Sequence, residues 1–290
     1  MAIAEEIGKP QPRLIPWTRK LEGMPWWMLI LLLVGLLIVY SIYSSDIYQD
    51  AFTFLLPGLK LTIVVTLTSF SISIVLGLIA GLGRVSKNIV FYNLSTLYAE
   101  VIRGVPLLVQ LLYVAFVLVP LGVDLLNAIG GLMLQHASSN PLLGIAHSLA
   151  NLNIKDVDMT VRAIVGLAFG YGAFEAEVFR GGIQSIERGQ MEAARSLGMS
   201  YFQAMRYIIL PQAIRRMLPP LGNDFIAMLK DSSLISALAV RELTQLGKLH
   251  RSRTFRTFEA WNMVAFLYLI MTLSLSLLVR IMERRMAFEE

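Results

Sequence analysis

The chain has 290 residues and a formal net charge of +5, and 56% of its residues are hydrophobic whereas only 16% are charged. An ordinary soluble domain carries about 25% charged residues, so this composition excludes a soluble globular protein and indicates a surface that faces lipid. The absence of cysteine excludes disulfide bonds and thiolate metal sites. The basic residues flank apolar segments and form no aromatic-interleaved patch, which favours membrane orientation over nucleic-acid binding.

The first predicted membrane span covers residues 26–45 and follows an N-terminal tail, 1–25, that holds four basic residues. A positively charged tail before an apolar run is also typical of a signal peptide. This run is too long for a cleaved segment, and no small-residue cleavage site follows it. We therefore expect a retained, additional transmembrane helix.

Five further spans follow, since a helix needs about 20 largely apolar residues to cross a bilayer. Three of them, at 61–83, 104–123 and 260–279, contain no charged residue. The other two, at 161–180 and 217–240, are interrupted by charges. The pattern predicts an all-α integral membrane protein with about six transmembrane helices.

The basic residues predict the orientation, because Lys and Arg accumulate in cytoplasmic connections. With both termini in the cytoplasm, four of the connections agree with this rule. The segment 241–256 does not, since it holds five basic residues and would lie outside. Either this segment is held there by packing against the protein, or the number of spans is wrong by one. We keep six spans.

The longest outer connection is the insertion 124–160, whose mixed composition predicts short helices and turns. One interpretation is a loop that packs over the helix bundle. The other is a docking platform for a soluble partner. The sequence does not distinguish them.

A polar helical hairpin is predicted inside the cytoplasmic segment 185–216. A first helix over about 185–197 ends at Gly198, which can adopt a left-handed backbone. Ser200 and Gln203 form a capping-box pair at the start of a second helix that runs to about residue 210. We expect Pro211 to interfere with its continuation.

The hairpin offers a surface to another protein. Ala193, Ala194 and Gly198 have little side-chain bulk, so a partner can approach them closely, whereas Glu192 and Arg195 place charge at the edge. The alternative is an amphipathic hairpin that rests on its own bundle.

The order of residues from Glu192 to Pro211 resembles the Glu-Ala-Ala cytoplasmic loop of ABC-importer permeases. The flanking motifs narrow the resemblance to the permease subunits of polar-amino-acid uptake systems, of the histidine, glutamate, glutamine, arginine and opine type. They are 103–110 (RGVPLLVQ), 177–186 (EVFRGGIQSI), 218–225 (LPPLGNDF) and 229–234 (LKDSSL). The likeness covers about residues 53–285 and leaves out the first helix and the outer insertion.

The resemblance implies a five-helix type I ABC importer core, here with one additional N-terminal helix, in a prokaryotic plasma (inner) membrane. It implies a complex with two separate ATPase subunits, a second permease chain, identical or not, and a soluble amino-acid-binding protein. The ATPase subunits would bind ATP and Mg and would grip Glu192, Ala193, Ala194, Arg195 and Gly198. The chain itself has no phosphate-binding loop of the G-x-x-x-x-G-K-[ST] type, no metal-ligand cluster and no catalytic constellation, so we expect a transport subunit and not an enzyme.

The candidate substrate-binding residues are charges within the predicted spans, because an ionisable group in hydrocarbon costs at least about 2.5 kcal/mol and is functional by default. They are Glu175, Asp224, Lys230, Asp231, Arg103 and Glu177. Two pairs, Glu100 with Arg103 and Glu177 with Arg180, have the spacing of ion pairs on one helix face. Asp224 and Asp231 share a face and invite a cation or a basic residue.

Glu175 is the most informative of these charges. If its carboxylate faces a substrate cavity, it attracts an amino group or a cationic side chain, which favours basic amino acids as substrates. It could equally face the second permease chain. The main alternative function is an ion-coupled secondary amino acid transporter that uses Glu175 and Asp224 as proton or cation sites. That class needs inverted repeats, which the sequence does not display.

Overall fold

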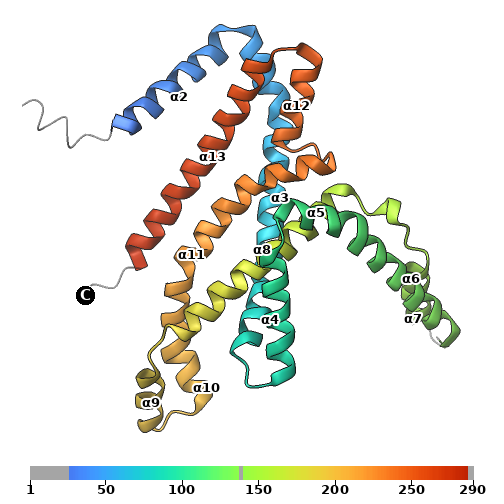
Figure 1. Cartoon of the computed structure of the whole chain (residues 1–290), viewed down its shortest axis with the longest axis vertical. Helices are drawn as coiled ribbons and strands as arrows, with labels where there is room; N and C mark the ends of the chain where they lie inside the picture. Colours follow the sequence, from blue (N-terminus) through green and yellow to red (C-terminus); the bar gives the residue numbers. More distant parts are fainter. Residues whose placement is uncertain (1–25, 137–139, 287–290) are drawn as a thin grey trace, which may run out of the picture. The chain divides into compact units, whose positions relative to one another are not determined.

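The computed structural model describes residues 26–136 and 140–286, and within these ranges it is helical apart from short connections and contains no strand. The elements in chain order are α2 (Trp26–Ser44), α3 (Asp46–Val85), α4 (Ile89–Gly104), α5 (Leu107–Tyr113), η1 (Val114–Leu118), α6 (Val119–His136), α7 (Asn140–Ala150), η2 (Ile154–Asp156), α8 (Met159–Gln184), α9 (Arg188–Ser196), α10 (Tyr201–Ala204), η3 (Met205–Ile209), α11 (Leu210–Asp231), η4 (Ser232–Leu238), α12 (Leu243–Thr254) and α13 (Thr257–Met286) (Figure 1).

The chain divides into two compact units, Met1–Gln49 and Asp50–Glu290. In the first unit α2 forms where the additional span is expected, and none of its residues is buried. Its apolar residues surround the helix on all sides, with a mean hydropathy of 2.3 over the best window. A helix that is hydrophobic all round is suited to a lipid environment.

Four helical stretches of the described chain are long and apolar enough to cross a membrane: Trp26–Ser44, Asp46–Val85, Leu107–Gln135 and Thr257–Arg284. They overlap the four uncharged predicted spans, and three of them are longer than expected. The two charge-interrupted spans correspond to α8 and α11, with 26 and 22 residues. Both exceed the length of about 20 residues that a bilayer requires.

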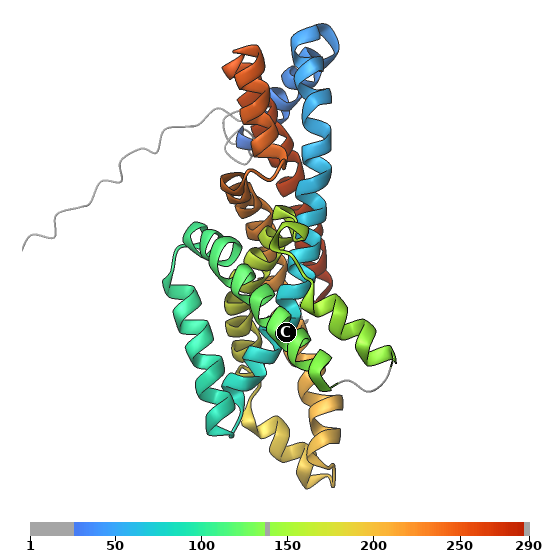
Figure 2. The ribbon, with the colours of Figure 1, turned by 90° about the vertical axis from the view of Figure 1, so that its right-hand side faces the viewer.

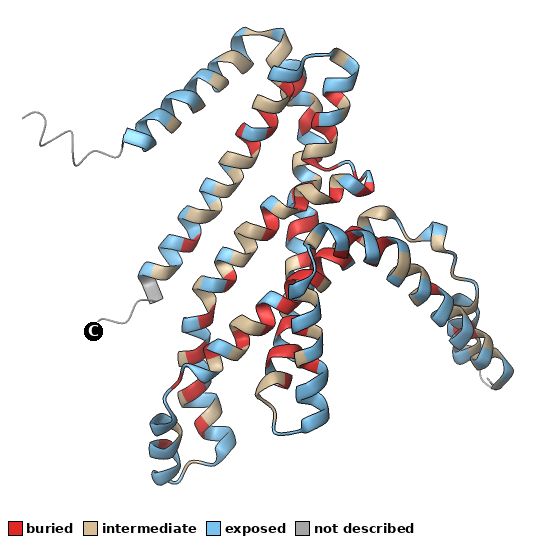
Figure 3. Cartoon of the chain, in the orientation of Figure 1, coloured by how far each residue is buried: buried red, intermediate tan, exposed pale blue. Residues whose placement is uncertain are grey.

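The core of the second unit lies where α8 packs against α3. Buried residues of α3 are mostly small, and glycines let the two backbones approach. A Cβ atom at Gly77 would lie 2.6 Å from Cβ of Glu175, and one at Gly81 would lie 2.6 Å from Cβ of Phe179. Figure 3 shows buried residues along both helices, whereas most of the α6–α7 pair is exposed.

The corner between α4 and α5 explains part of the motif at 103–110. The helix ends at Gly104, and the next two residues have extended backbones. The side-chain amide of Gln110 donates to the carbonyl oxygens of Ile102 and Val105, both at 2.6 Å. One buried glutamine thus adds a hydrogen bond to the Ile102 carbonyl, which also accepts from the Val105 N–H, and satisfies the Val105 carbonyl beyond the helix end.

The expected interruption at Pro211 is wrong. The chain passes from α10 through the π-helical turn η3 into α11 without a break, and Pro211 lies in the first turn of α11. The Leu210 N–H donates to the carbonyl oxygen of Met205, five residues back. The wider π turn makes room for the proline ring beside the preceding carbonyls, so the helix continues past a residue that has no N–H to donate. The hairpin's second arm therefore continues directly into α11.

The α-helix of the last charged span ends earlier than the predicted 240. It ends at Asp231 and continues as the 3₁₀ turn η4, and Ala239 then adopts a left-handed backbone with φ of 57°. The basic segment 241–256 forms α12, whose buried face contacts α3 and α13. The buried carboxylate of Glu242 caps α12 by accepting from the Thr244 and Gln245 N–H groups, both at 2.7 Å.

The outer insertion is more helical than expected. It contains the C-terminal half of α6, the helix α7 and the short turn η2. A Cβ atom at Gly130 would lie 2.3 Å from the backbone nitrogen of Ala150, so α6 and α7 approach closely. Asp158 caps α8 by accepting from the Thr160 N–H at 2.7 Å, and hydrogen bonds from the side chain and then the backbone of Thr160 lower the pKa of the Asp158 carboxyl.

We expect Gly77→Ala to destabilise the fold by about 1–3 kcal/mol, because the added methyl group meets α8 where neither backbone can retreat. The matched control is Gly144→Ala in α7, where a Cβ atom meets nothing within 4 Å. This control should be neutral or stabilising by up to about 1 kcal/mol. Thermal unfolding of the purified chain in detergent, followed by tryptophan fluorescence, measures both. Wild-type stability of Gly77→Ala would contradict the close packing.

Candidate functional site

The hairpin turn at Gly198 has the geometry that the sequence predicts. Gly198 has a φ of 85°. Its N–H donates to the carbonyl oxygen of Arg195 at 3.0 Å, and the Met199 N–H donates to that of Ala194 at 3.2 Å. These two bonds form a Schellman motif, which requires a left-handed residue at the position of Gly198.

The second arm begins with the predicted capping box. The Gln203 N–H donates to Ser200 Oγ at 3.3 Å, and the Ser200 N–H donates to Gln203 Oε1 at 2.9 Å. The two arms are therefore joined by a turn whose polar groups are satisfied locally. The hairpin lies at one end of the second unit, beyond α8 and α11, in both views (Figures 1 and 2).

The exposed face of the hairpin differs from the predicted one at one position. Glu192, Ala193, Arg195 and Gly198 are exposed, as a docking surface requires. Ala194 is only 5% exposed, so its assignment to that face is wrong. Its small size serves the inside of the hairpin, where a larger side chain would separate the two arms.

Large apolar side chains on the hairpin also face outward. Leu197 is 83% exposed, Phe202 is 70% exposed, and Tyr201 and Tyr207 are more than half exposed. The sequence analysis overlooked them, although Leu197 directly precedes the turn glycine and Phe202 lies in the first turn of the second arm. A group of exposed apolar residues at the end of a polar hairpin is typical of a protein interface.

Glu175 lies inside the second unit, between α8 and α3. Its side chain is fully buried, and its Oε1 accepts a hydrogen bond from Ser73 Oγ at 2.7 Å. Its Oε2 is buried and has no hydrogen-bond partner within the described chain. The carboxylate is thus half satisfied and is covered by this chain's own helices.

The other charged candidates, on α11, have different contacts. Asp231 accepts a hydrogen bond from the Tyr171 hydroxyl at 2.8 Å, whereas Asp224 has a buried oxygen, Oδ2, without a partner in the described part of the chain. Lys230 lines a cavity of about 270 Å³ formed with η4, α12 and α13. The predicted shared face of Asp224 and Asp231 therefore does not give them a shared partner.

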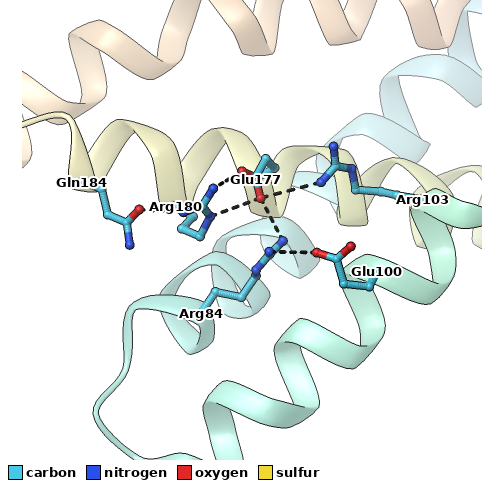
Figure 4. Close-up of polar contacts among 6 residues, drawn as sticks. All are labelled: Arg84, Glu100, Arg103, Glu177, Arg180 and Gln184. Carbon is cyan, nitrogen blue, oxygen red and sulfur yellow. Dashed lines mark hydrogen bonds and ion pairs between the residues drawn. The ribbon is translucent and has the colours of Figure 1, made fainter.

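Glu177 forms the centre of an ionic cluster at the end of α8 that leads to the hairpin (Figure 4). Its carboxylate contacts the guanidinium groups of Arg84 at 2.9 Å, Arg103 at 3.7 Å and Arg180 of its own helix. The pairing of Glu177 with Arg180 agrees with the sequence spacing. The pairing of Glu100 with Arg103 is wrong, because Glu100 lies 3.1 Å from Arg84 instead.

This difference has a steric reason. The last turn of α3 packs directly on α4, where a Cβ atom at Gly83 would meet the side chain of Ser95, and α3 also packs on α8. Arg84 can therefore reach carboxylates on both of these helices. Arg103 lies instead over the ring of Phe174, 6.0 Å from its centroid. A helical spacing rule describes only neighbours on one helix and contains no information on a third helix.

A helical membrane protein with an exposed hairpin at one end and charged residues buried among its spans has the features of a transport permease. Residues 73–288 match the family described as "Binding-protein-dependent transport system inner membrane component". The chain belongs to this family and is an amino acid ABC-transporter permease with the fold of type I importers.

Individual relatives agree with this assignment. The chain is 35% identical over 236 residues to the "Glutamine transport system permease protein GlnP" of Escherichia coli K12, covering 81% of this chain and 94% of the relative. It is 33% identical to the "Probable glutamine ABC transporter permease protein GlnM" of Bacillus subtilis, covering 84% and 98%. A solved "amino acid ABC transporter with histidines" is 35% identical, with a TM-score of 0.65 and coverage of 84% and 98%.

We expect Ser200→Ala to loosen the second arm, because the loss of a serine N-cap costs about 1 kcal/mol. Hydrogen exchange of the amides at 201–204 should become about fivefold faster. Ser196→Ala is the matched control, since Ser196 Oγ donates only to the carbonyl of Glu192 within its own helix. Unchanged exchange in Ser200→Ala would show that the capping box does not hold the arm.

Proposed function

We propose that this chain forms the pathway of an ATP-driven importer that carries polar amino acids into the cytoplasm, and that a separate ATPase drives it through the hairpin from Glu192 to Pro211. The observation that carries the proposal is the hairpin's outward face, which combines exposed apolar side chains with Glu192 and Arg195. Exposed apolar area costs about 25 cal/mol per Å² in water, and a partner that covers it recovers this free energy.

The connection of the hairpin to the membrane helices supports a mechanical role. Ile186, Ile209 and Met217 pack in one buried cluster with Phe179, so the hairpin shares a core with the ends of α8 and α11. Arg216 also donates a hydrogen bond to the carbonyl oxygen of Ser185, between α8 and α9. A partner that moves the hairpin therefore moves both helices with it.

The complex that we propose contains two ATPase subunits that bind ATP and Mg, a second permease chain and a soluble amino-acid-binding protein. The hairpin then faces the cytoplasm together with both termini, as the basic connections predict. The family description names a binding-protein-dependent system, which supports the soluble partner. This arrangement also disfavours the ion-coupled secondary transporter, which has no use for an exposed hairpin.

For the substrate we propose polar amino acids, with a preference for cationic ones to be tested through Glu175. Two of the relatives above are named for glutamine, which makes L-glutamine the neutral probe. Glu175 is covered by α3 and α8, so its carboxylate contacts a substrate only if these helices separate. Without such a separation it acts on a cationic substrate at a distance, through its negative charge. Asp224, Asp231 and Lys230 remain the candidates on α11, whereas Arg103 and Glu177 are already engaged in the ionic cluster.

Gly198→Val should abolish coupling, because a β-branched residue at a φ of 85° is strained and deforms the turn that presents the docking face. We expect ATP-dependent uptake of L-glutamine into proteoliposomes to fall at least tenfold. Gly198→Asn is the matched control, since asparagine tolerates the left-handed backbone. It should retain most of the activity.

Glu192→Lys tests the same surface without strain, since Glu192 is exposed on α9. We expect weaker co-purification with the ATPase and a similar loss of uptake, with the melting temperature of the isolated permease unchanged. The coupling role is lost if either variant binds the ATPase and transports L-glutamine as the wild type does.

Glu175→Gln should reduce uptake of L-arginine about fivefold more than uptake of L-glutamine, because the amide keeps the acceptor for Ser73 but removes the negative charge. Ser73→Ala is the control, since it removes the hydrogen bond and leaves the charge. Competition uptake with both labelled amino acids measures the ratio. An equal loss for the two substrates would exclude a role of Glu175 in specificity.

A further inference from the structure

The ionic cluster around Glu177 joins three helices at the point where the hairpin meets the membrane domain. Arg84 is in the last turn of α3, Arg103 is in the last turn of α4, and Glu177 lies two turns before the end of α8. Figure 4 shows the guanidinium groups of Arg84, Arg103 and Arg180 converging on the Glu177 carboxylate. Ser185, Ile186 and Glu187 are the only residues between α8 and α9.

The members of the cluster differ in how firmly they are held. The side chain of Arg84 is only 10% exposed and contacts both Glu177 and Glu100. Arg180 is bound to Glu177 within the same helix and donates to Gln184 at 2.6 Å. Arg103 is the loosest member, because it is 3.7 Å from Glu177 and its side chain is 38% exposed.

The charges do not balance within the cluster. Three guanidinium groups meet the carboxylates of Glu177 and Glu100, and the Glu100 side chain is 62% exposed. A well-buried arginine that loses its carboxylate retains an uncompensated charge, which is strongly unfavourable. A partly exposed pair contributes little and can exchange its partner for water. The cluster thus has one tight contact, between Arg84 and Glu177, and one loose contact, between Arg103 in the last turn of α4 and Glu177.

We propose that Glu177 is a positioning residue of the transport cycle, an ionic latch that holds the ends of α3 and α8 together while the last turn of α4 is released and recaptured through Arg103. A movement of the hairpin reaches α8 at Ser185 and turns the helix end that carries Glu177. The α3–α8 side moves as one body because Arg84 and the glycine contacts hold it. The last turn of α4 opens because Arg103 can leave its weak contact for water. The rest of α4 stays in place, since the Tyr98 hydroxyl donates to the carbonyl oxygen of Phe169 at 2.6 Å and Glu100 pairs with Arg84. This inference rests on the proposed function, since it assigns the path by which ATPase movement reaches the spans.

Glu177→Gln tests the latch in the complete complex of permease, ATPase and binding protein. The amide keeps the shape but loses the charge that attracts three arginines. We expect ATP hydrolysis without binding protein to rise about threefold and L-glutamine uptake per ATP to fall about fivefold. Glu100→Gln is the matched control, because Glu100 also pairs with Arg84 but is mostly solvated. Its effect on both quantities should be less than twofold.

The distance between α4 and α8 provides a readout that does not depend on the substrate. The chain has no cysteine, so spin labels can be placed at Val101→Cys, an exposed position in the last turn of α4, and at Gly181→Cys on α8, where a Cβ atom meets nothing within 4 Å. In the wild-type complex we expect two distances between the labels, and we expect ATP to shift the population from the first distance to the second. In Glu177→Gln we expect the second distance to be populated without ATP.

The outcomes separate the latch from the proposed function. If the wild-type complex does not take up L-glutamine, L-histidine or L-arginine with ATP, the proposed function fails, whereas the spin-label distances still test the latch. If Glu177→Gln lowers only the melting temperature, with uptake per ATP and label distances as in the wild type, Glu177 is a static brace and the latch is overturned. An equal effect of Glu100→Gln would overturn the specific assignment to Glu177.

Discussion

The close contact between α3 and α8 is the constraint on which the rest of the second unit depends. Because Gly77 and Gly81 have no side chains, α8 packs directly on the α3 backbone. A Cβ atom at either position would lie 2.6 Å from a Cβ atom of α8. In lipid there is little hydrophobic force between helices, so close van der Waals packing of small residues must supply the attraction. The same contact covers Glu175 and brings Arg84 to Glu177. The buried acid and the ionic cluster are therefore consequences of one packing arrangement.

Much of the fold could be predicted from the sequence because lipid requires long apolar helices and leaves few alternatives. The hairpin turn was equally predictable, since Gly198, Ser200 and Gln203 act through local hydrogen bonds. The predictions that failed depend on information beyond one helix. The partner of Glu100 is on α3, and the burial of Ala194 follows from how two arms pack. The prediction for Pro211 failed for another reason, because a π turn accommodates a proline that an α turn would not.

The charged candidate residues could be found by composition, but their roles could not be assigned in the same way. A charge within a predicted span indicates either a pathway or a structural pair, and the spacing alone does not choose. Glu177 is engaged by three arginines, whereas Glu175 and Asp224 each retain a buried oxygen without a partner within the described residues. A buried oxygen without a hydrogen bond costs free energy. Its presence at these two positions therefore favours a role other than structural pairing.

The hairpin and the ionic cluster place opposite requirements on the end of α8. Under the proposed function the hairpin transmits force, and its arms share a buried core with α8 and α11 through Ile186 and Ile209. The pathway must also open and close, so at least one contact between helices has to be weak enough to break. Apolar cores are poor at this, because each separated pair of surfaces loses its dispersion contacts in full. A partly exposed ion pair such as Arg103 with Glu177 loses little when water replaces it. The two contacts of Glu177 therefore differ in what they allow: the buried Arg84 holds α3 to α8, whereas the partly exposed Arg103 is the contact that can open.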